Sequence, residues 1–372
     1  MENIVLFGGA FDPVHNGHLR MANAASFLLN ADIVFVPSKN PRWKNPTAKI
    51  DHRIKMLELA VKQDGISGTT ISDFETHSNQ EVTYTIDTIR HYANKYRGKK
   101  LYLLIGADQV NLFHQWKEAD EIAKLATVVF ISRPDIVLNE RNVAHFNMEH
   151  LAYEHTGEVS STKVRNLQSI DIPTSVIDYV EIHKLYYMER LSKILPPNRL
   201  AHCLSVAHLA RRIAHKNERP EYQKAYIAGL LHDLGKSHDL HDSLSIMKND
   251  YKDYVNLPQF TYHQFVGAYL AEKEFGIKDE EILDAIRFHA TGKPHMSALG
   301  KIIYSADKID PIRGFNSKAL VKKCLQNYYL GFVIVLSANR DYLLSNGKDI
   351  NNPLTDACMK LYLGKGNEIE SR

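Results

Sequence analysis

The sequence predicts an α/β domain with a parallel sheet, followed by an all-α domain. Its 372 residues are enough for two domains of ordinary size. In the first half, short apolar runs alternate with helical patterns, which is typical of a parallel sheet covered by helices on both faces. From about Glu189 onward the pattern is helical with almost no strand signal. We therefore expect domains at 1–188 and 189–372, with Pro196-Pro197 as a linker between helices.

The first half contains five short segments that predict strands, bounded by turn residues. They are residues 4–7, 33–36, 69–72, 101–105 and 128–131. Helical periodicity separates them at about 17–29, 51–62 and 83–96, where Asp51 is a natural N-cap. This alternation predicts a doubly wound, Rossmann-like domain.

The second half shows apolar spacing of about 3.6 residues in several segments. The predicted helices are residues 199–215, 222–232, 263–275, 280–289 and 319–337. No segment here alternates polar and apolar residues as a half-buried strand would. An all-α domain is therefore expected.

Composition indicates a soluble globular protein of a reducing compartment. The formal net charge is only +3, so charge favours neither a nucleic-acid nor a membrane partner. The three cysteines are scattered, which predicts free thiols and neither a disulfide framework nor a thiolate zinc site. The apolar run at 4–7 is too short for a signal peptide, and the run at 332–336 is too short to span a bilayer. We expect a cytoplasmic protein whose oligomeric state the sequence leaves open.

The strongest motif is GGAFDPVHNGH at residues 8–18, directly after the first strand. Gly8 and Gly9 allow the backbone to approach a phosphate closely. The helix that begins near Gly17 adds a positive dipole end. His15 and His18 are three residues apart, so they share a helix face and can donate hydrogen bonds to a phosphate that gains charge.

A second motif, VSSTKVR at residues 159–165, combines hydroxyl groups with a fixed charge. Ser160, Ser161 and Thr162 can cap a helix while offering hydroxyl and N–H groups to phosphates. Arg165 lies one turn further and can stabilise a leaving pyrophosphate. Alone, this segment is an ordinary helix start, but together with the first motif it predicts an ATP-phosphate site.

The two motifs resemble the GGxFDPxHxGH and ISSTxIR patterns of the nicotinate-nucleotide adenylyltransferase family. The segments EVTYTIDT at 81–88 and GAD at 106–108, with Trp116 beyond, fit the same layout. The resemblance implies adenylyl transfer from ATP, with Mg²⁺, to nicotinate mononucleotide, in a nucleotidyltransferase domain with an H-x-G-H motif. It implies catalytic roles for His15, His18 and Arg165 and assigns ATP and phosphate contacts to Gly8, Gly9, Phe11, Lys44, Asp108, Arg133, Ser160, Ser161 and Thr162.

The resemblance also implies that Tyr84 and Trp116 enclose the nicotinate ring while residues near Thr85 bind its carboxylate. The alternative is that both aromatic residues belong to the core. Around Lys44 the sequence NPRWK departs from the family's P-P-H-K. Nicotinamide mononucleotide, phosphopantetheine or a CTP-linked alcohol are alternative acceptors on the same fold.

The second half carries an H…HD…D constellation formed by His202, His232-Asp233 and Asp307. Imidazole and carboxylate ligands suit Fe, Mn or Zn. The pattern resembles HD-domain metal-dependent phosphohydrolases. The strings GLLHDLGK, HQFVGA, AIRFHATG and YSADKIDP, at 229–236, 263–268, 285–292 and 304–311, resemble the branch that hydrolyses diadenosine tetraphosphate to two ADP.

This resemblance implies two metals, iron before manganese or zinc. Asp233 would bridge them, and His263 and His289 would hold the second. It assigns polyphosphate contacts to Lys236, Lys308 and Arg313, although the last two could equally be surface charges. His238 and His241 are interpreted as loop residues. Alternatives are another HD hydrolase of nucleotides and a regulatory module that binds a nucleotide without hydrolysing it.

Overall fold

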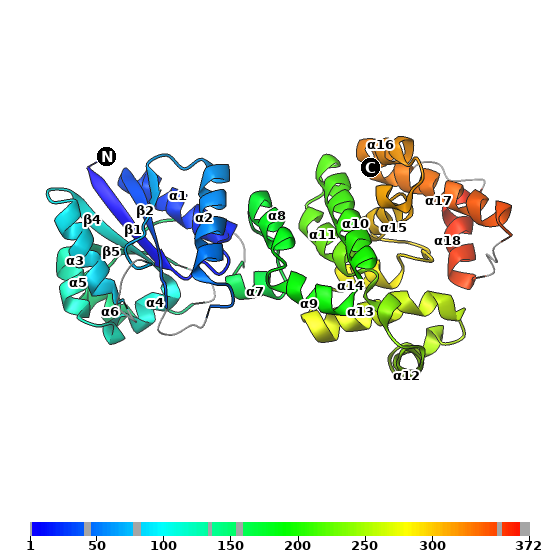
Figure 1. Ribbon diagram of the computed structural model, residues 1–372, viewed down its shortest axis with the longest axis horizontal. Coiled ribbons are helices and arrows are strands. Elements are labelled where there is room, and N and C mark those ends of the chain that lie inside the picture. The colour runs from blue at the N-terminus through cyan, green and yellow to red at the C-terminus, as the bar shows by residue number, and fades with distance from the viewer. Residues whose placement is uncertain are drawn as a thin grey trace. The chain divides into compact units, whose positions relative to one another are not determined.

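The computed structural model describes residues 2–40, 46–76, 83–132, 136–153, 159–347 and 352–364. It consists of two compact units (Figure 1). Unit 1 comprises Met1–Arg165 and Asp171–Tyr186, and unit 2 comprises Asn166–Ile170 and Tyr187–Arg372. The proline pair lies within unit 2, where Pro197 is the first residue of a helix. Among the described residues, no helix combines the length and the apolar character needed to cross a membrane.

Unit 1 contains a six-stranded sheet in which every neighbouring pair is parallel. In spatial order the strands are β3 (Thr69–Ile71), β2 (Ala31–Pro37), β1 (Asn3–Gly9), β4 (Lys100–Gly106), β5 (Thr127–Ile131) and β6 (Glu149–His150). The five predicted strands and the α/β class are confirmed. The sixth strand was not predicted because its two residues give no alternation to detect.

Helices cover both faces of this sheet, as the apolar strands require. They are α1 (Asn16–Leu29), α2 (Ile50–Asp64), α3 (Thr85–Lys95), α4 (Ala107–Leu112), α5 (Ala119–Leu125), α6 (Glu140–His145), α7 (Ser161–Arg165) and α8 (Thr174–Ile182), with the 3₁₀ turn η1 (Phe113–Gln115). Figure 1 shows α1 and α2 on one side of the strands and α3 and α5 on the other. Ile4 and Leu6 of β1 join a hydrophobic cluster with Ile86 and Ile89 of α3.

The strand order places the start of the chain at the centre of the sheet. β1 pairs with β2 on one side and with β4 on the other, so connections leave in opposite directions from this point. Ligands of open α/β sheets bind outside the carboxyl ends of the strands at such a switch point. The GGAFDPVHNGH motif follows β1, and the GAD segment follows β4, its neighbour. The fold thus brings these two predicted segments to one edge.

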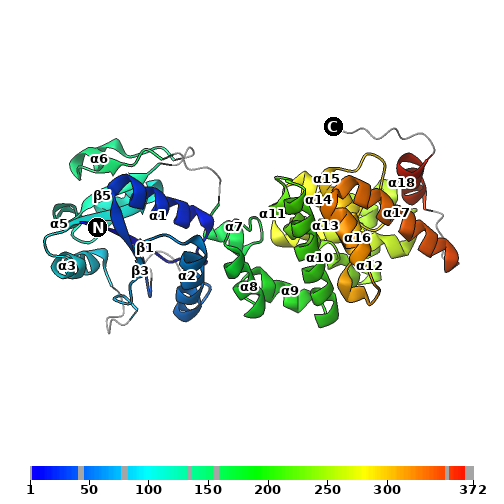
Figure 2. The same cartoon turned by 90° about the horizontal axis from the view of Figure 1, so that it is seen from above.

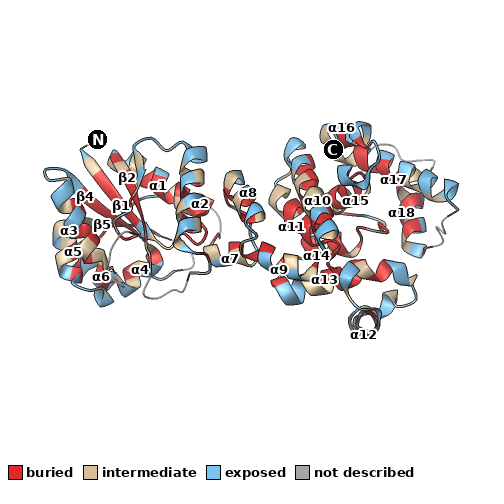
Figure 3. Ribbon diagram, in the orientation of Figure 1, coloured by how far each residue is buried: buried red, intermediate tan, exposed pale blue. Residues whose placement is uncertain are grey.

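Unit 2 is helical, which confirms the predicted all-α class. Its helices are α9 (Tyr187–Ile194), α10 (Pro197–Lys216), α11 (Tyr222–Leu231), α12 (Leu240–Asp250), α13 (Tyr262–Phe275), α14 (Glu280–Arg287), α15 (Ala298–Lys308), α16 (Lys318–Gln326), α17 (Tyr328–Ser345) and α18 (Pro353–Leu363). The 3₁₀ turns are η2 (Leu234–Ser237), η3 (Lys252–Tyr254), η4 (Gln259–Thr261) and η5 (Pro311–Arg313). Figure 2 gives a second view of these helices, and Figure 3 shows their buried faces turned inward.

Two details of the predicted helices are wrong. The single helix expected at 319–337 is divided into α16 and α17, because Asn327 adopts an extended conformation and its side chain accepts a hydrogen bond from the N–H of Leu330. His232 and Asp233 do not lie within a helix: α11 ends at Leu231, and η2 begins after Asp233. An apolar pattern continues through both breaks, so periodicity alone could not locate them. The interpretation of His241 as a loop residue is also wrong, because it lies in the first turn of α12, whereas His238 does lie between η2 and α12.

Glu75 follows β3 in unit 1, and only 9% of its surface is exposed. The Thr88 hydroxyl of α3 donates a 2.8 Å hydrogen bond to Oε1. Burial raises the pKa of the Glu75 carboxyl to about 7, although the Thr88 hydrogen bond opposes this shift. Folded unit 1 therefore holds this proton more tightly than the unfolded chain does.

Glu75→Gln is expected to remove part of the pH dependence of stability. Between an ordinary glutamate pKa of 4.5 and about 7 the folded state binds more protons, so the free energy of unfolding falls as pH rises. The amide of the variant does not ionise. Relative to the parent, its free energy of unfolding should therefore rise by up to about 3 kcal/mol between acid and alkaline pH. Chemical denaturation measures this gain, with Glu58→Gln at an exposed position as the control. Equal pH slopes for the parent and Glu75→Gln would contradict the assignment.

Candidate active sites

The first site is built on the glycine turn after β1. A side chain at Gly8 would meet no atom of the described residues within 4 Å, which leaves space beside the backbone there. A Cβ at Gly9 would lie 3.0 Å from the Phe11 ring. Phe11 has a φ of 47° and is 2% exposed, with its ring against Phe7, Phe35 and His18. The Phe11 ring is therefore part of the packing that supports the turn.

The two histidines of this motif lie together at the start of α1. His15 is the N-cap, His18 is the third helical residue, and their rings stack with centroids 3.6 Å apart. The N–H of His15 donates a 3.2 Å hydrogen bond to Nδ1 of His18. Because Nδ1 accepts, the proton of neutral His18 is on Nε2. Nε2 of neutral His18 is therefore a hydrogen-bond donor.

Asp12 connects the motif to three distant segments. Its buried carboxylate accepts hydrogen bonds from the N–H groups of Thr47 and Ala48 and from the Tyr186 hydroxyl, at 2.7, 3.1 and 2.8 Å. Burial raises the pKa of the Tyr186 hydroxyl, and the charge of Asp12 adds to this effect. Arg165 lies 3.7 Å from the same carboxylate. This network fixes the FDP turn from outside the motif.

A buried guanidinium holds the same turn from the other side. Arg53 of α2 is 1% exposed and donates hydrogen bonds to the carbonyl oxygens of Ala10, Ser38 and Lys39 at 2.6, 2.9 and 3.0 Å. It also donates to the carbonyl of Ala48 at 3.2 Å. No pattern in the sequence indicated this role, because an arginine in a polar helix position is usually exposed.

The SSTKVR segment lies directly against the FDP turn. The Ser161 hydroxyl donates to the carbonyl of Pro13 at 2.9 Å, and the Ser160 hydroxyl accepts from the N–H of Lys163 at 3.2 Å. Arg165 donates to the carbonyl of Asp12 at 2.6 Å and to the Thr162 hydroxyl at 3.0 Å. The structure therefore brings both predicted phosphate motifs together although about 150 residues separate them.

The predicted pyridine contacts share another part of unit 1. Tyr84 and Trp116 are partly buried and pack on the same hydrophobic cluster. Lys117 Nζ lies 4.2 Å from the centroid of the Tyr84 ring, so the segment after η1 is beside Tyr84. Thr85 is the first residue of α3. Asp108 is exposed near the start of α4, and Lys44 and Arg133 lie outside the described residues.

Unit 2 gathers all six predicted metal ligands. The structure contains two overlapping groups that could hold an ion: His202, His232 and Asp233, and Asp233, His263 and His289. Asp233 belongs to both groups. Asp307 Oδ1 lies 3.3 Å from His202 Nε2 and 3.7 Å from His232 Nε2, which completes the first group. His263 Nε2 and His289 Nε2 lie 3.7 and 3.5 Å from Asp233 Oδ1.

Glycines allow the elements that carry these ligands to approach closely. A Cβ at Gly229 of α11 would lie 2.7 Å from the Cα of Ala207 in α10, the helix that carries His202. A Cβ at Gly235 would lie 2.3 Å from the carbonyl oxygen of His263. Any side chain at Gly235 would therefore separate η2 from α13, and with it Asp233 from His263.

The four imidazoles are oriented as metal ligands. Nδ1 of His202 is 2.6 Å from Asp310, and Nδ1 of the other three is bonded to the carbonyls of Gly229, Phe260 and Ile286 at 2.7, 2.8 and 2.8 Å. Such bonds place the proton on Nδ1 and leave the Nε2 lone pair for a metal. Nε2 of His202 and of His232 is buried and has no well-aligned hydrogen-bond partner. The residues present therefore fit divalent metal ions.

Electrostatics favour neutral rings at His263 and His289 and an ionised carboxylate at Asp233. Burial lowers the pKa of His263 well below its usual value, and nearby His289 adds to the effect. Burial also lowers the pKa of His289. Although burial opposes ionisation of Asp233, the neighbouring His232 and His289 hold the pKa of its carboxyl well below the usual range. Although burial opposes the shift, the carboxylates of Asp307 and Asp310 raise the pKa of His202 to about 9, so a metal bound there would displace a proton.

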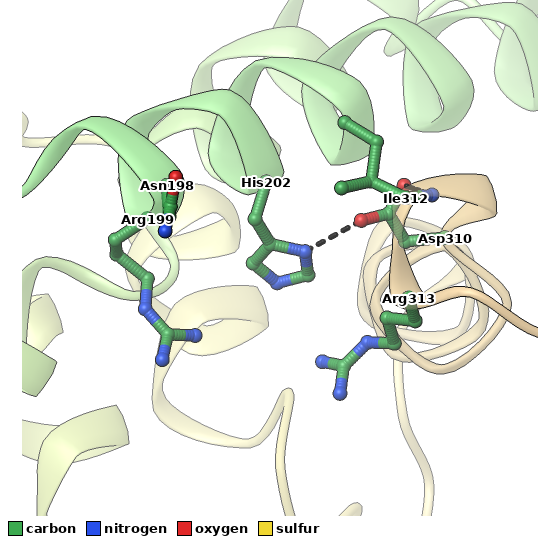
Figure 4. A pocket seen from close by; sticks show the side chains of 6 residues that line it. All are labelled: Asn198, Arg199, His202, Asp310, Ile312 and Arg313. Atoms are coloured by element: carbon green, nitrogen blue, oxygen red, sulfur yellow. Dashed lines mark hydrogen bonds and ion pairs between the residues drawn. The ribbon is translucent and has the colours of Figure 1, made fainter.

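Three cations surround the ligand cluster. Arg199 lies 2.6 Å from Asp233, Lys308 lies 2.9 Å from Asp307, and Arg313 also contacts Asp307. Lys236 is exposed in η2 and forms none of the described ion pairs with these carboxylates. Figure 4 shows Arg199 and Arg313 on either side of the His202 ring, where they line a cavity of about 220 Å³.

Five important residues were not assigned from the sequence. Asp12 and Asp310 stand inside the quoted motifs, and Arg199 lies one turn before His202, so their positions were available as signals. Arg53 and Tyr186 had no local signal. Their contacts arise from long-range packing, which spacing along the chain does not encode.

Comparisons with known proteins match both units. A cytidylyltransferase-like family model matches residues 6–167, and an HD domain model matches residues 199–312. A Mycoplasma genitalium protein named probable nicotinate-nucleotide adenylyltransferase/Ap4A hydrolase is 32% identical over 90% of this chain and 97% of its own. A Mycoplasma pneumoniae protein of the same name is 30% identical over 89% of this chain and 97% of its own length. Among solved structures, one from Clostridium acetobutylicum is described as a predicted HD superfamily hydrolase involved in NAD metabolism. It is 27% identical in sequence, covers 56% of this chain and 98% of its own chain, and has a TM-score of 0.43.

Asp310→Asn is expected to weaken metal binding about 10- to 100-fold, because Asp310 orients His202 from behind and its charge raises the basicity of the ring. Metal titration followed by elemental analysis measures the effect. Asp279→Asn, at the N-cap of α14, is the matched control and should retain the parent affinity. Unchanged affinity in Asp310→Asn would show that His202 does not depend on this contact.

Proposed function

Since this chain belongs to the family of two-domain nicotinate-nucleotide adenylyltransferase/Ap4A hydrolases, we propose that each unit catalyses one of these two reactions. Unit 1 transfers the adenylyl group of ATP to nicotinate mononucleotide and releases pyrophosphate. Unit 2 hydrolyses diadenosine tetraphosphate to two ADP. The observation that supports the transfer is the joining of residues 8–18 to residues 159–165 through Arg165, Asp12 and Ser161. The observation that supports the hydrolysis is the sharing of Asp233 between two ligand groups.

In the transfer, an oxygen of the nucleotide phosphate attacks the α-phosphorus of ATP. A new P–O bond forms, the bond to the bridging oxygen breaks, and pyrophosphate leaves with that electron pair. No side chain is needed as a base, since the attacking phosphate is already anionic. Catalysis is therefore positioning plus stabilisation of charge. Magnesium bound with ATP would neutralise part of the negative charge on its phosphates.

The residues of unit 1 divide these tasks. The backbone at Gly8 and Gly9 gives the phosphates close access to the sheet edge. His18 donates from Nε2 to an oxygen that gains charge, and His15, stacked on it, fixes its ring. Arg165 supplies a fixed positive charge for pyrophosphate, and its contacts with Asp12 and Thr162 hold it in place before substrate arrives.

The acceptor is recognised on the side of unit 1 that carries Tyr84 and Trp116. Two partly buried aromatic rings on one cluster provide a surface on which a pyridine ring can stack. Thr85 begins α3, whose first N–H groups can bind a carboxylate. Lys117, beside the Tyr84 ring, adds a positive charge that favours the acid over the amide.

An HD domain binds divalent metal, and we propose two ions in unit 2, iron before manganese or zinc. When bound, such ions would supply a water of lowered pKa and would polarise the phosphate. His202, His232, Asp233 and Asp307 would hold the first, and His263, His289 and Asp233 the second. Arg199, Lys308 and Arg313 bind and orient the anionic chain, and the leaving ADP keeps the electron pair of the cleaved anhydride bond.

His18→Ala is expected to lower the rate of transfer about 10²- to 10³-fold, because it removes a donor to developing charge. A product assay with ATP, Mg²⁺ and either nicotinate or nicotinamide mononucleotide measures it, and the parent should prefer nicotinate. His145→Ala, at an exposed position of unit 1, is the control. Hydrolysis of diadenosine tetraphosphate should be unchanged in both variants. Formation of dinucleotide from neither acceptor by the parent would refute the transfer reaction.

His263→Ala is expected to lower bound metal from two ions to one per chain and to slow hydrolysis at least about 100-fold. His238→Ala is the matched control, since His238 lies in the loop after η2 and belongs to neither ligand group. Elemental analysis and an ADP assay give the two readouts, and chelation of the parent should abolish hydrolysis reversibly. Full hydrolysis by metal-free protein would exclude the proposed chemistry.

A further inference from the structure

A second cavity of unit 2 lies next to the ligand cluster. It measures about 520 Å³ and is bordered by the end of α15, the residues after η5, and helices α16 and α17. Pockets for small molecules usually measure about 300–1,000 Å³. The cavity is therefore large enough for a nucleoside.

The walls of this cavity are mostly apolar and include two exposed aromatic rings. Phe315 is 46% exposed and Tyr342 is 55% exposed, although large aromatic side chains usually lie in a core. Leu320 and Val335 contribute aliphatic surface. A base that stacks on exposed aromatic rings gains affinity whatever its identity.

One polar side chain of the cavity is fixed by a buried partner. Asn339 of α17 donates a 3.1 Å hydrogen bond to the hydroxyl of Tyr304, which is fully buried in α15. An amide held in this way can form hydrogen bonds with the edge of a base. The cavity therefore combines stacking surface with a group able to read a nucleobase.

The cationic end of the cavity is shared with the ligand cluster. Lys308 and Arg313 line the cavity, and both contact Asp307, a predicted metal ligand. Arg313 also lines the smaller cavity beside Arg199 and His202 (Figure 4). An anion bound by Arg313 would thus lie between the apolar cavity and the metal ligands.

We propose that the larger cavity binds one nucleoside of the substrate, with its base against Phe315 and Tyr342. The phosphate chain then passes Arg313 into the smaller cavity, where Arg199 binds it near the ligands. This inference rests on the proposed hydrolysis of a dinucleoside polyphosphate. It adds that the substrate is recognised by a nucleoside as well as by its charge, so an inorganic polyphosphate binds without using the aromatic rings.

Kinetics of the metal-loaded full chain test the assignment. Phe315→Ala and Tyr342→Ala should each raise the KM for diadenosine tetraphosphate about tenfold with little change in kcat. Inhibition by inorganic tripolyphosphate should be unchanged, because it lacks a base. Arg199→Ala should weaken the binding of both diadenosine tetraphosphate and tripolyphosphate. Leu344→Ala, an equally exposed residue of α17 outside the cavity, is the matched control and should leave both unchanged.

Two further measurements test the assignment if the alanine variants fail to fold, and they distinguish binding in unit 2 from binding in unit 1. Ala338→Trp fills the cavity without removing a contact and should raise the same KM. Photolabelling with 8-azido-ADP, which can also enter unit 1, should modify a peptide of unit 2 that contains Phe315 or Tyr342. Labels confined to unit 1, or an unchanged KM in all three cavity variants while hydrolysis proceeds, would overturn the assignment and leave the proposed function standing. Absence of hydrolysis by the parent would refute that function, and a label at Phe315 or Tyr342 would still support a nucleoside cavity.

Discussion

The buried carboxylate of Asp233 is the group on which the architecture of unit 2 depends. It lies within 3.8 Å of four imidazoles and contacts Arg199, so elements from across the unit converge on a single negative charge. Burying a charge costs several kcal/mol unless partners compensate it. The unit provides those partners by allowing backbones to approach at Gly229 and Gly235. The close packing of these helices is therefore needed to compensate the charge of Asp233. A helix that moved away would leave the buried carboxylate uncompensated.

Unit 1 also buries a carboxylate and compensates it with hydrogen bonds in place of imidazoles. Asp12 is also buried and ionisable, and two backbone N–H groups and a tyrosine hydroxyl bind it. Because these donors come from distant segments, the glycine turn after β1 is held in one conformation before substrate arrives. Arg165 is oriented by the same turn. Positioning is what adenylyl transfer requires most, since its nucleophile is already charged.

Features that depend on local pattern were predicted from the sequence. Short apolar runs located five of the six strands, and the family resemblance named six residues of unit 2 that the structure brings together. Prediction failed where long-range contact decides the outcome. Arg53 is polar in a helix pattern but buried by four carbonyl contacts. The apolar run at 319–337 is divided where Asn217 of a distant segment donates to the Cys324 carbonyl and accepts from the Tyr328 N–H. The turn at His232–Asp233 was not predicted because it depends on a close approach to α13.

If each unit catalyses its proposed reaction, the two sites need different groups, because their nucleophiles differ. Attack by an anionic phosphate requires only that repulsion be screened and the leaving group stabilised, and neutral donors such as His18 with one fixed cation, Arg165, suit that task. Attack by water requires that the nucleophile itself be generated near neutral pH. Imidazoles with protonated Nδ1 and bare Nε2 fit a metal that does so. The proposed reactions would therefore account for the contrast between the two sets of histidines. His18 of unit 1 accepts at Nδ1, whereas the four histidines of unit 2 have Nδ1 bonded to the protein and Nε2 facing the ligand cluster.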